Sequence, residues 1–264
     1  MKANQMTIQK LTLASMFTAL GVLMASPVVS MMVMLFGVPA VRIDLIAIPV
    51  ILAGVILGPL FGLTVGIITD ILAFLLFTSA FGPYHVGFTL NLALTGLIPG
   101  LFVLLIKKTK FKLPIFWINI SFLSLLSVLS IIYLIETNEL RIEGNMYELS
   151  STFKTVFIIS IILFFSVLLF SMMYKRKQHP KEKLNMDSFM LIVLFIEVFV
   201  VILLTPLWVN DLYNLPSNLY LPGVLIRVLR AMWLIPLKVY IIYYLYRVSK
   251  KVFEHSLAFE SNSF

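Results

Sequence analysis

Five ionisable residues lie inside long apolar stretches of the chain, where charges are rarely found: Asp70, Glu197, Arg227, Arg230 and Lys238. A charge at the centre of a membrane helix costs about 2.5–3.5 kcal/mol on insertion scales. Such residues therefore usually face the interior of a helix bundle, where they pair with one another or line a pathway. If the two acids neutralise two of the three bases, one positive charge remains, which predicts a site for an anionic ligand.

The roles of these charges differ in the expected site. Arg227 and Arg230 are three residues apart and so share one face of a helix, and we expect Arg227 to bind the ligand. For Lys238 we expect a structural ion pair, or an ammonium that extends toward water. Asp70 has two interpretations: it contacts the ligand, or it is a buried structural acid within a helix-packing motif.

Aromatic and amide side chains gather in two segments beside these charges, FGPYHVGFTLN (81–91) and TPLWVNDLY (205–213). Flat rings near cations can hold a planar heteroaromatic ligand between them. The candidate contacts in these segments are Tyr84, His85, Asn91 and Trp208. Tyr213 is better explained by the aromatic belt that forms at a membrane surface.

The elements that must position these residues are membrane helices. The chain has 264 residues, of which 61% are hydrophobic and 12% charged, and its mean hydropathy is +1.04. Soluble domains are only about 45–50% apolar, and a bilayer core needs about 20 mainly apolar residues per helix. The sequence predicts an all-helical integral membrane protein with eight spans, at 10–36, 44–58, 60–80, 87–106, 114–135, 155–174, 188–209 and 221–246.

Basic residues collect on one side of this predicted topology. With the amino terminus inside, the cytoplasmic segments hold 14 of the 20 Lys and Arg residues, whereas the opposite loops are mainly acidic. The positive-inside rule then predicts a multi-pass protein of the cell membrane with both termini cytoplasmic. Topology and anionic membrane lipid account for the net charge of +8, so we expect no nucleic-acid partner.

Glycines occur at every fourth position from 54 to 66 in the segment GVILGPLFGLTVGIITD (54–70). Small residues at this spacing let membrane helices approach closely. Pro59 begins a helix well and cannot continue the previous one. We therefore expect a tight turn at LGPL, followed by a helix that carries Asp70 toward the bundle axis.

Small residues also line the first predicted helix, including Ala14, Ser15 and Ala19. Such a face suits the docking of another membrane helix. Packing within the bundle explains it almost as well.

Several kinds of chemistry have no sequence support. The chain contains no G-x-x-x-x-G-K-[ST], G-x-S-x-G or H-E-x-x-H motif, so P-loop ATP hydrolysis is excluded and an enzyme is not expected. It has no cysteine, and its three histidines lack metal-ligand spacing, so we expect neither a metal site nor a cofactor. Any pumping must take its energy from a partner or an ion gradient.

Five segments resemble, in order, the substrate-binding S component of an energy-coupling factor (ECF) transporter, and most closely its folate-specific branch. They are LTLASMFTALGVLMA (11–25), VRIDLIAIPVILAGVILGPLFGLTVGIITDIL (41–72), HVGFTLNLALTGLIPGL (85–101), LLTPLWVNDLY (203–213) and LIRVLRAMWLIPLKVYIIYYL (225–245). The resemblance covers somewhat over a third of the chain. It implies a six-helix core that captures a vitamin from outside and, with a transmembrane coupling protein and two ATPase subunits, reorients to release it.

The resemblance also implies roles for single residues. Arg42 belongs to the loop after the first helix that helps to close the site, His85 and Asn91 lie where the fourth helix enters it, and Trp208 and Arg227 form its far wall. A pterin would stack there with hydrogen bonds from Asn91, while a carboxylate meets Arg227 or Arg42. Ala14, Ser15 and Ala19 would contact the coupling protein. The expected ligand contacts are Arg42, Asp70, Tyr84, His85, Asn91, Trp208, Arg227 and Arg230.

The chain departs from this family in one large respect. Residues 107–186 contain two additional predicted helices, where the usual member has a short connection. We therefore expect core helices in 1–106 and 187–264, separated by an inserted two-helix segment that preserves the orientation of the core. Two alternatives stay open: the same fold with a different vitamin, and a membrane scaffold without transport in which Asp70 and Arg227 only hold helices together.

Overall fold

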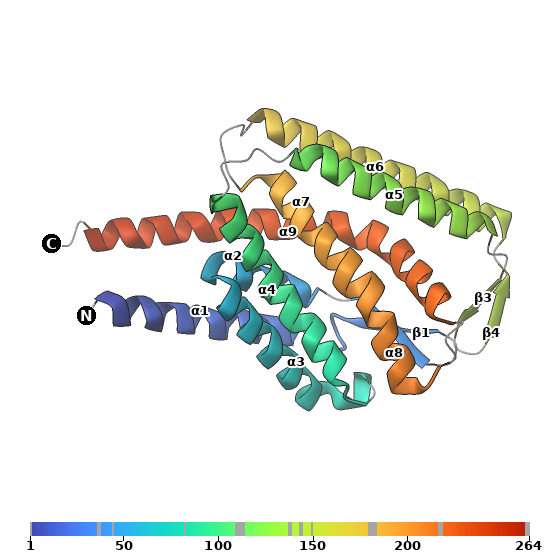
Figure 1. Ribbon diagram of the computed structural model, residues 1–264, viewed down its shortest axis with the longest axis horizontal. Helices are drawn as coiled ribbons and strands as arrows, with labels where there is room; N and C mark the ends of the chain where they lie inside the picture. Colours follow the sequence, from blue (N-terminus) through green and yellow to red (C-terminus); the bar gives the residue numbers. More distant parts are fainter. Residues whose placement is uncertain are drawn as a thin grey trace.

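The computed structural model describes residues 2–35, 38–43, 45–81, 83–108, 114–136, 139–142, 145–148, 150–178, 184–215 and 219–261. Most of these residues are helical (Figure 1). The helices are α1 (Lys2–Ala25), α2 (Ala47–Leu57), α3 (Pro59–Phe81), α4 (Val86–Lys108), α5 (Ile115–Glu136), α6 (Ser151–Gln178), α7 (Met186–Phe195), the π-helix η1 (Ile196–Leu204), α8 (Thr205–Tyr213) and α9 (Tyr220–Ser261). Helices α7, η1 and α8 follow one another without a break and together cover the predicted span 188–209. Each of the other predicted spans contains one helix.

Five helical segments among the described residues are long and apolar enough to cross a membrane: Ile8–Ala25, Pro59–Phe77, Val86–Ile106, Ile115–Glu136 and Met186–Tyr213. Large apolar side chains cover their outer faces, as at Leu75 and Trp117, each 66% exposed. The chain is thus a multi-pass membrane protein. The count of eight spans stays a prediction, because the eleven residues of α2 rise only about 16 Å, roughly half of a hydrocarbon core.

The first predicted span is wrong in its second half, because α1 ends at Ala25. Ser26 precedes Pro27, and the residue before a proline is disfavoured in helical conformation. The hydroxyl of Ser30 then lies 3.0 and 2.9 Å from the carbonyl oxygens of Ala25 and Ser26, so its one proton is shared between two acceptors at the helix end. The chain continues as a β-hairpin instead of a helix.

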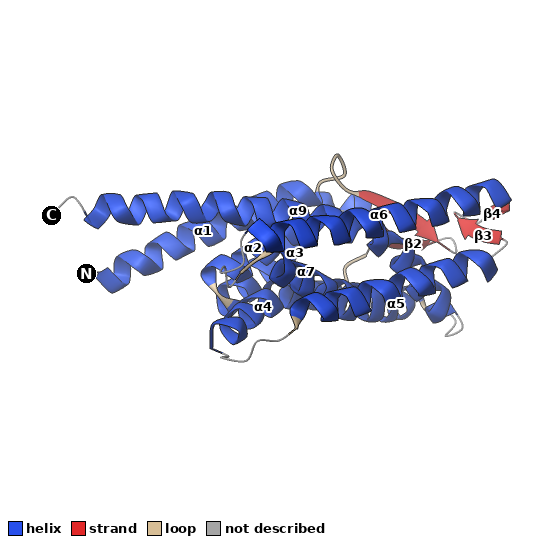
Figure 2. Ribbon diagram, turned by 90° about the horizontal axis from the view of Figure 1, so that it is seen from above, coloured by secondary structure: helices blue, strands red, loops and turns tan. Residues whose placement is uncertain are grey.

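Four short strands form one antiparallel sheet that the all-helical prediction missed. They are β1 (Met31–Leu35), β2 (Val38–Ile43), β3 (Glu139–Ile142) and β4 (Asn145–Glu148), in the order β2-β1-β3-β4. The two hairpins meet where Leu35 pairs with Ile142. The sheet lies at one end of the bundle, and both chain ends lie at the other (Figures 1 and 2). The segment between α5 and α6 thus shares a sheet with the segment between α1 and α2.

The glycine spacing is explained by close contact of α2 and α3 with α4. A Cβ atom at Gly54 or Gly62 would collide with the carbonyl oxygen of Gly96, and one at Gly66 would collide with that of Leu92. Gly58 instead ends α2 with a φ of +103°, a conformation that favours glycine. The predicted turn at LGPL is confirmed, since α3 begins at the next residue.

The short helix α2 lies at the centre of the bundle, and ten of its eleven residues are buried. It packs against α1, α3 and α4 on one side and against α9 on the other. Helices α5 and α6 run side by side and pack on α7 and α9 (Figure 1). They therefore cover the side of the bundle away from α1 and α3.

The π-helix in the middle of the α7–α8 run has a local cause in the Thr205-Pro206 pair. Proline cannot donate a backbone hydrogen bond, and its ring collides with the carbonyl four residues earlier. The backbone N–H and the hydroxyl of Thr205 both reach the carbonyl oxygen of Val200, the hydroxyl at 3.1 Å. This wider turn begins at Ile196, next to Glu197, and ends at the wall of the candidate site.

Candidate functional site

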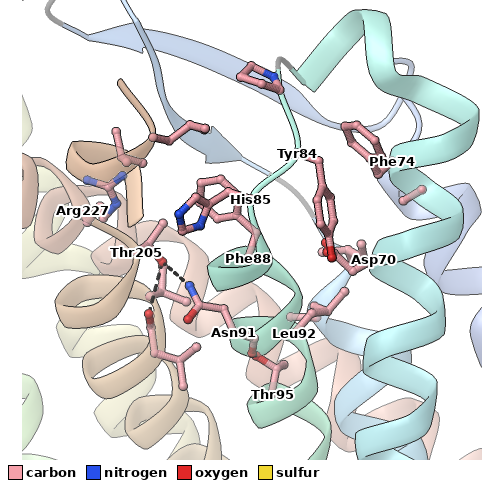
Figure 3. Close-up of a pocket in the computed structure, with 18 of the residues that line it drawn as sticks. Asp70, Phe74, Tyr84, His85, Phe88, Asn91, Leu92, Thr95, Thr205 and Arg227 are labelled. Carbon is pink, nitrogen blue, oxygen red and sulfur yellow. Dashed lines mark hydrogen bonds between the residues drawn. The ribbon is translucent and has the colours of Figure 1, made fainter. Parts of the chain in front are cut away.

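Most of the predicted contacts surround a cavity of about 200 Å³ between α3, α4, η1, α8 and α9 (Figure 3). Six of the eight expected residues line it: Asp70, Tyr84, His85, Asn91, Arg227 and Arg230. Apolar walls come from Phe74, Phe88, Leu92, Val200 and Val209. The site therefore combines charges, rings and hydrogen-bonding groups from segments far apart in the sequence.

Asp70 on α3 is held by a chain of two hydroxyl groups. Thr89 Oγ1 donates to Asp70 Oδ2 at 2.6 Å, and the Tyr84 hydroxyl lies 2.7 Å from Thr89 Oγ1. A threonine hydroxyl has one proton, which the carboxylate takes, so the proton between Thr89 and Tyr84 must come from Tyr84. This chain of hydroxyl groups therefore links the α3–α4 connection to Asp70 through one donor, Thr89.

Asn91 on α4 joins two residues of α8. Its Nδ2 donates to Thr205 Oγ1 at 3.0 Å, and its Oδ1 accepts from Trp208 Nε1 at 3.0 Å. Both functional groups of the amide are thus used within the protein. The arrangement fixes α4 against α8, and Asn91 also lines the cavity.

His85 lies in the segment between α3 and α4, where both ring nitrogens have partners. Nδ1 accepts the backbone N–H of Gly87 at 3.0 Å, so Nε2 carries the ring proton and donates to Asp211 Oδ2 at 3.0 Å. The ring also lies 5.8 Å from the rings of Phe88 and Trp208, measured between centroids. His85 is therefore held in one orientation at the cavity wall.

The cations of α9 are not equivalent. Glu197 on η1 is 1% exposed, and it accepts hydrogen bonds from Lys238 Nζ at 2.5 Å and Arg230 Nη2 at 3.1 Å. Arg227 is also buried, and its Nη1 donates to the carbonyl oxygen of Gly223 at 2.9 Å, which folds the guanidinium back along α9. The carboxylate of Glu197 thus balances one of the two positive charges of Arg230 and Lys238. This contact agrees with the structural ion pair that we expected for Lys238.

Two expected contacts are not among the residues that the structure places in the lining. Trp208 is absent from the cavity lining and instead supports Asn91. Arg42 lies in β2, but its side chain is outside the described residues. Tyr213, assigned to a membrane belt from the sequence, lines the cavity.

The sequence interpretation also missed three residues of this site: Phe74, Thr89 and Thr205. The sequence contained a signal for Thr205, which directly precedes Pro206. A proline inside an apolar helix has no N–H, so it leaves a carbonyl oxygen without its usual donor, and a neighbouring hydroxyl can donate to it. Thr89 and Phe74 carried no comparable signal. Their role depends on how α3 and α4 are paired in space.

The small-residue stripe of α1 is divided between two faces. Ala14 is buried in the cluster that α1 shares with α2, α3 and α4, so it is not available on the outer surface. Ser15 and Ala19 are exposed. Successive residues of a helix point about 100° apart around its axis, so Ala14 can face the bundle while Ser15, the next residue, faces outward.

The described residues contain no group of three His, Asp or Glu side chains that could hold a metal ion. Comparison of the sequence with models of known protein families and with curated proteins found no match. The resemblance to ECF S components therefore rests on the five sequence segments quoted above.

Proposed function

We propose that this protein is the substrate-binding S component of an ECF-type uptake transporter, with a folate-like pterin as its ligand. One observation carries the proposal: a cavity within an apolar helix bundle is lined by a carboxylate, two arginines, a lysine and several aromatic rings. Buried charges at membrane depth are costly and usually mark a ligand pathway. Clefts with apolar walls and a few converging polar groups are typical of small-molecule sites.

The size of the cavity restricts how such a ligand binds. At about 200 Å³ it is smaller than the roughly 300–1,000 Å³ of sites for drug-sized ligands. One ring system fits this space, and the rest of a folate-sized molecule would extend beyond it. A component that encloses its ligand before transfer is consistent with this size.

The proposed orientation places the sheet and the cavity toward the outside of the cell membrane. The residues of the α3–α4 connection and the end of α8 line the cavity, and β2 contacts α8 and α9. Both chain ends lie at the opposite end of the bundle (Figure 1). The distribution of basic residues supports a cytoplasmic location for that end.

A coupling protein and two ATPase subunits are the proposed partners. Ser15 and Ala19 are exposed on α1, and such small residues leave room for close approach of another helix. The inserted helices pack on α7 and α9, so they leave this face of α1 uncovered. An anionic ligand of another kind would use the same basic wall and is the nearest alternative.

A scaffold without transport is the candidate from another class. The buried Glu197 cluster favours it, since one carboxylate joins η1 to two positions on α9. Identification by mass spectrometry of small molecules that copurify with the protein, followed by titration with a vitamin panel, separates the two. Saturable binding of an anionic vitamin supports the S component, and its absence across the panel favours the scaffold.

A further inference from the structure

The β3–β4 hairpin joins α5 to α6, but it pairs with a strand that follows α1. Leu35 of β1 faces Ile142 of β3, and this pairing connects the two hairpins into one sheet. A two-stranded hairpin alone is marginally stable in water, whereas a sheet with more strands can be stable. Each hairpin therefore gains support from the other.

Helices α5 and α6 are fixed to the bundle along their length. Leu134 of α5 and Ile161 of α6 are buried in the same core cluster as residues of α7 and α9. Near the opposite end of α5, Asn119 Nδ2 donates to the backbone carbonyl oxygen of Asp187 in α7 at 2.8 Å, and both residues are buried. The β3–β4 hairpin is therefore attached to a well-packed pair of helices.

The β1–β2 hairpin lies beside the cavity. Its strand β2 contacts α8 and α9, which both contribute to the cavity lining, as at Val209 of α8. The strands pass the end of the cavity at which Tyr84 and His85 lie (Figure 3). Ile46 and Ala47, which follow β2 in the chain, also line the cavity. A movement of β1 and β2 away from α8 and α9 would open this end of the cavity.

The pairing of β1 with β2 is irregular near the residue that β3 contacts. The register shifts between Val33 and Met34, and such a shift disrupts the ladder of hydrogen bonds locally. Leu35 follows this irregularity and is the residue that pairs with Ile142. The β3 strand therefore adds backbone contacts where the β1–β2 ladder is weakest.

We propose that the pairing of β1 with β3 restrains the β1–β2 hairpin beside the cavity, so that the α5–α6 pair controls how readily the cavity opens. Because α5 and α6 are packed on α7 and α9, they provide the fixed end of this restraint. The inference goes beyond the proposed function, since it concerns access to the cavity and holds for any ligand.

A single cysteine measures this access, because the native chain has none. Val209→Cys places a thiol at a cavity-lining position that is 4% exposed. Val86→Cys is the matched control, since Val86 is 69% exposed at the start of α4. N-ethylmaleimide modifies the thiol in the full-length protein in detergent, and mass spectrometry of the peptide that contains it gives the rate.

Replacement of residues 139–142 by Gly-Ser-Gly-Ser should weaken the pairing with β1 and keeps the length of the chain. Modification of Val209→Cys should then become about three- to tenfold faster, the effect of losing about one net backbone hydrogen bond. Val86→Cys should react at its original rate. In the opposite direction, a disulfide formed in Val209→Cys protein that also carries Leu35→Cys and Ile142→Cys should make modification at position 209 slower.

Elution volume and unfolding midpoint show whether the variants are folded, and the disulfide-linked protein supplies the test if the replaced one is not. An unchanged rate at position 209 after the replacement overturns the proposal, as does an equal increase at positions 209 and 86. An unchanged rate in the disulfide-linked protein also overturns it. The measurement uses no ligand, so a failure to bind vitamins would overturn the proposed function and leave this restraint standing.

Discussion

Glu197 and Lys238 form a buried ion pair in which the carboxylate Oε1 and the ammonium Nζ are 2.5 Å apart. The two residues come from different helical runs, and Arg230 binds the other oxygen of the same carboxylate at 3.1 Å. One acid therefore organises two of the three basic residues that α9 carries at membrane depth. Removal of this acid leaves two buried cations without their shared partner.

Glu197→Gln is expected to lower the free energy of unfolding by about 3–5 kcal/mol, the usual cost of breaking a buried ion pair from one side. Unfolding in mixed micelles, followed by circular dichroism as denaturing detergent is added, measures the change. Lys238→Met should cost less, because Glu197 keeps Arg230. Equal stability of Glu197→Gln and wild type would contradict the structural role of the cluster.

Arg227→Ala is expected to weaken the binding of a carboxylate-bearing pterin about 10- to 100-fold. Lys238→Ala should weaken it much less, because the ammonium of Lys238 already binds Glu197. Fluorescence titration of both variants, after a check of their unfolding midpoints, compares them directly. Small and equal effects would remove Arg227 from the ligand site.

Trp208→Phe is expected to reduce ligand affinity several-fold and to destabilise the protein. The substitution keeps a ring but removes the N–H that donates to Asn91 Oδ1, and a buried acceptor without its donor costs about 1–3 kcal/mol. Trp117→Phe is the matched control, because Trp117 is 66% exposed on α5. An identical affinity in both variants would show that Asn91 does not depend on Trp208.

The sequence was informative where local chemistry decides the structure. The glycines of 54–66 predicted close helix contact, and Pro59 predicted the turn before α3. The sequence did not predict contacts between segments that are far apart in the chain. Asn91 is an example, because its hydrogen-bond partners lie more than 100 residues away. The strands were missed for the same reason, since an apolar run such as 31–35 fits a helix or a strand until its pairing is known.

Gly62→Ala is expected to destabilise the protein by about 1–3 kcal/mol or more, as overpacking usually does, because the new methyl group would meet the backbone of α4. Gly223→Ala is the matched control. A Cβ there would lie 3.3 Å from Arg227 Nη1, the end of a flexible side chain. Thermal unfolding in detergent compares the two, and equal midpoints would contradict the close packing of α3 on α4.

A disulfide between residues 35 and 142 is expected to form in the double variant Leu35→Cys, Ile142→Cys. These positions face each other in neighbouring antiparallel strands, where Cα atoms are about 4.5–5.5 Å apart, within the range for a disulfide. The native chain has no cysteine, so a mobility shift on a gel that reductant reverses reports this bond alone. Leu35→Cys with Glu139→Cys should not cross-link, and a shift there would indicate a different register.

The sheet also imposes an order on biosynthesis. The β1–β2 hairpin leaves the ribosome about a hundred residues before Ile142, its neighbour in β3, has been made. Until then one edge of β1 has open backbone groups that can pair with another chain. Nascent protein should therefore be most prone to wrong association after the β1–β2 hairpin has been made and before β3, which follows α5, has been made.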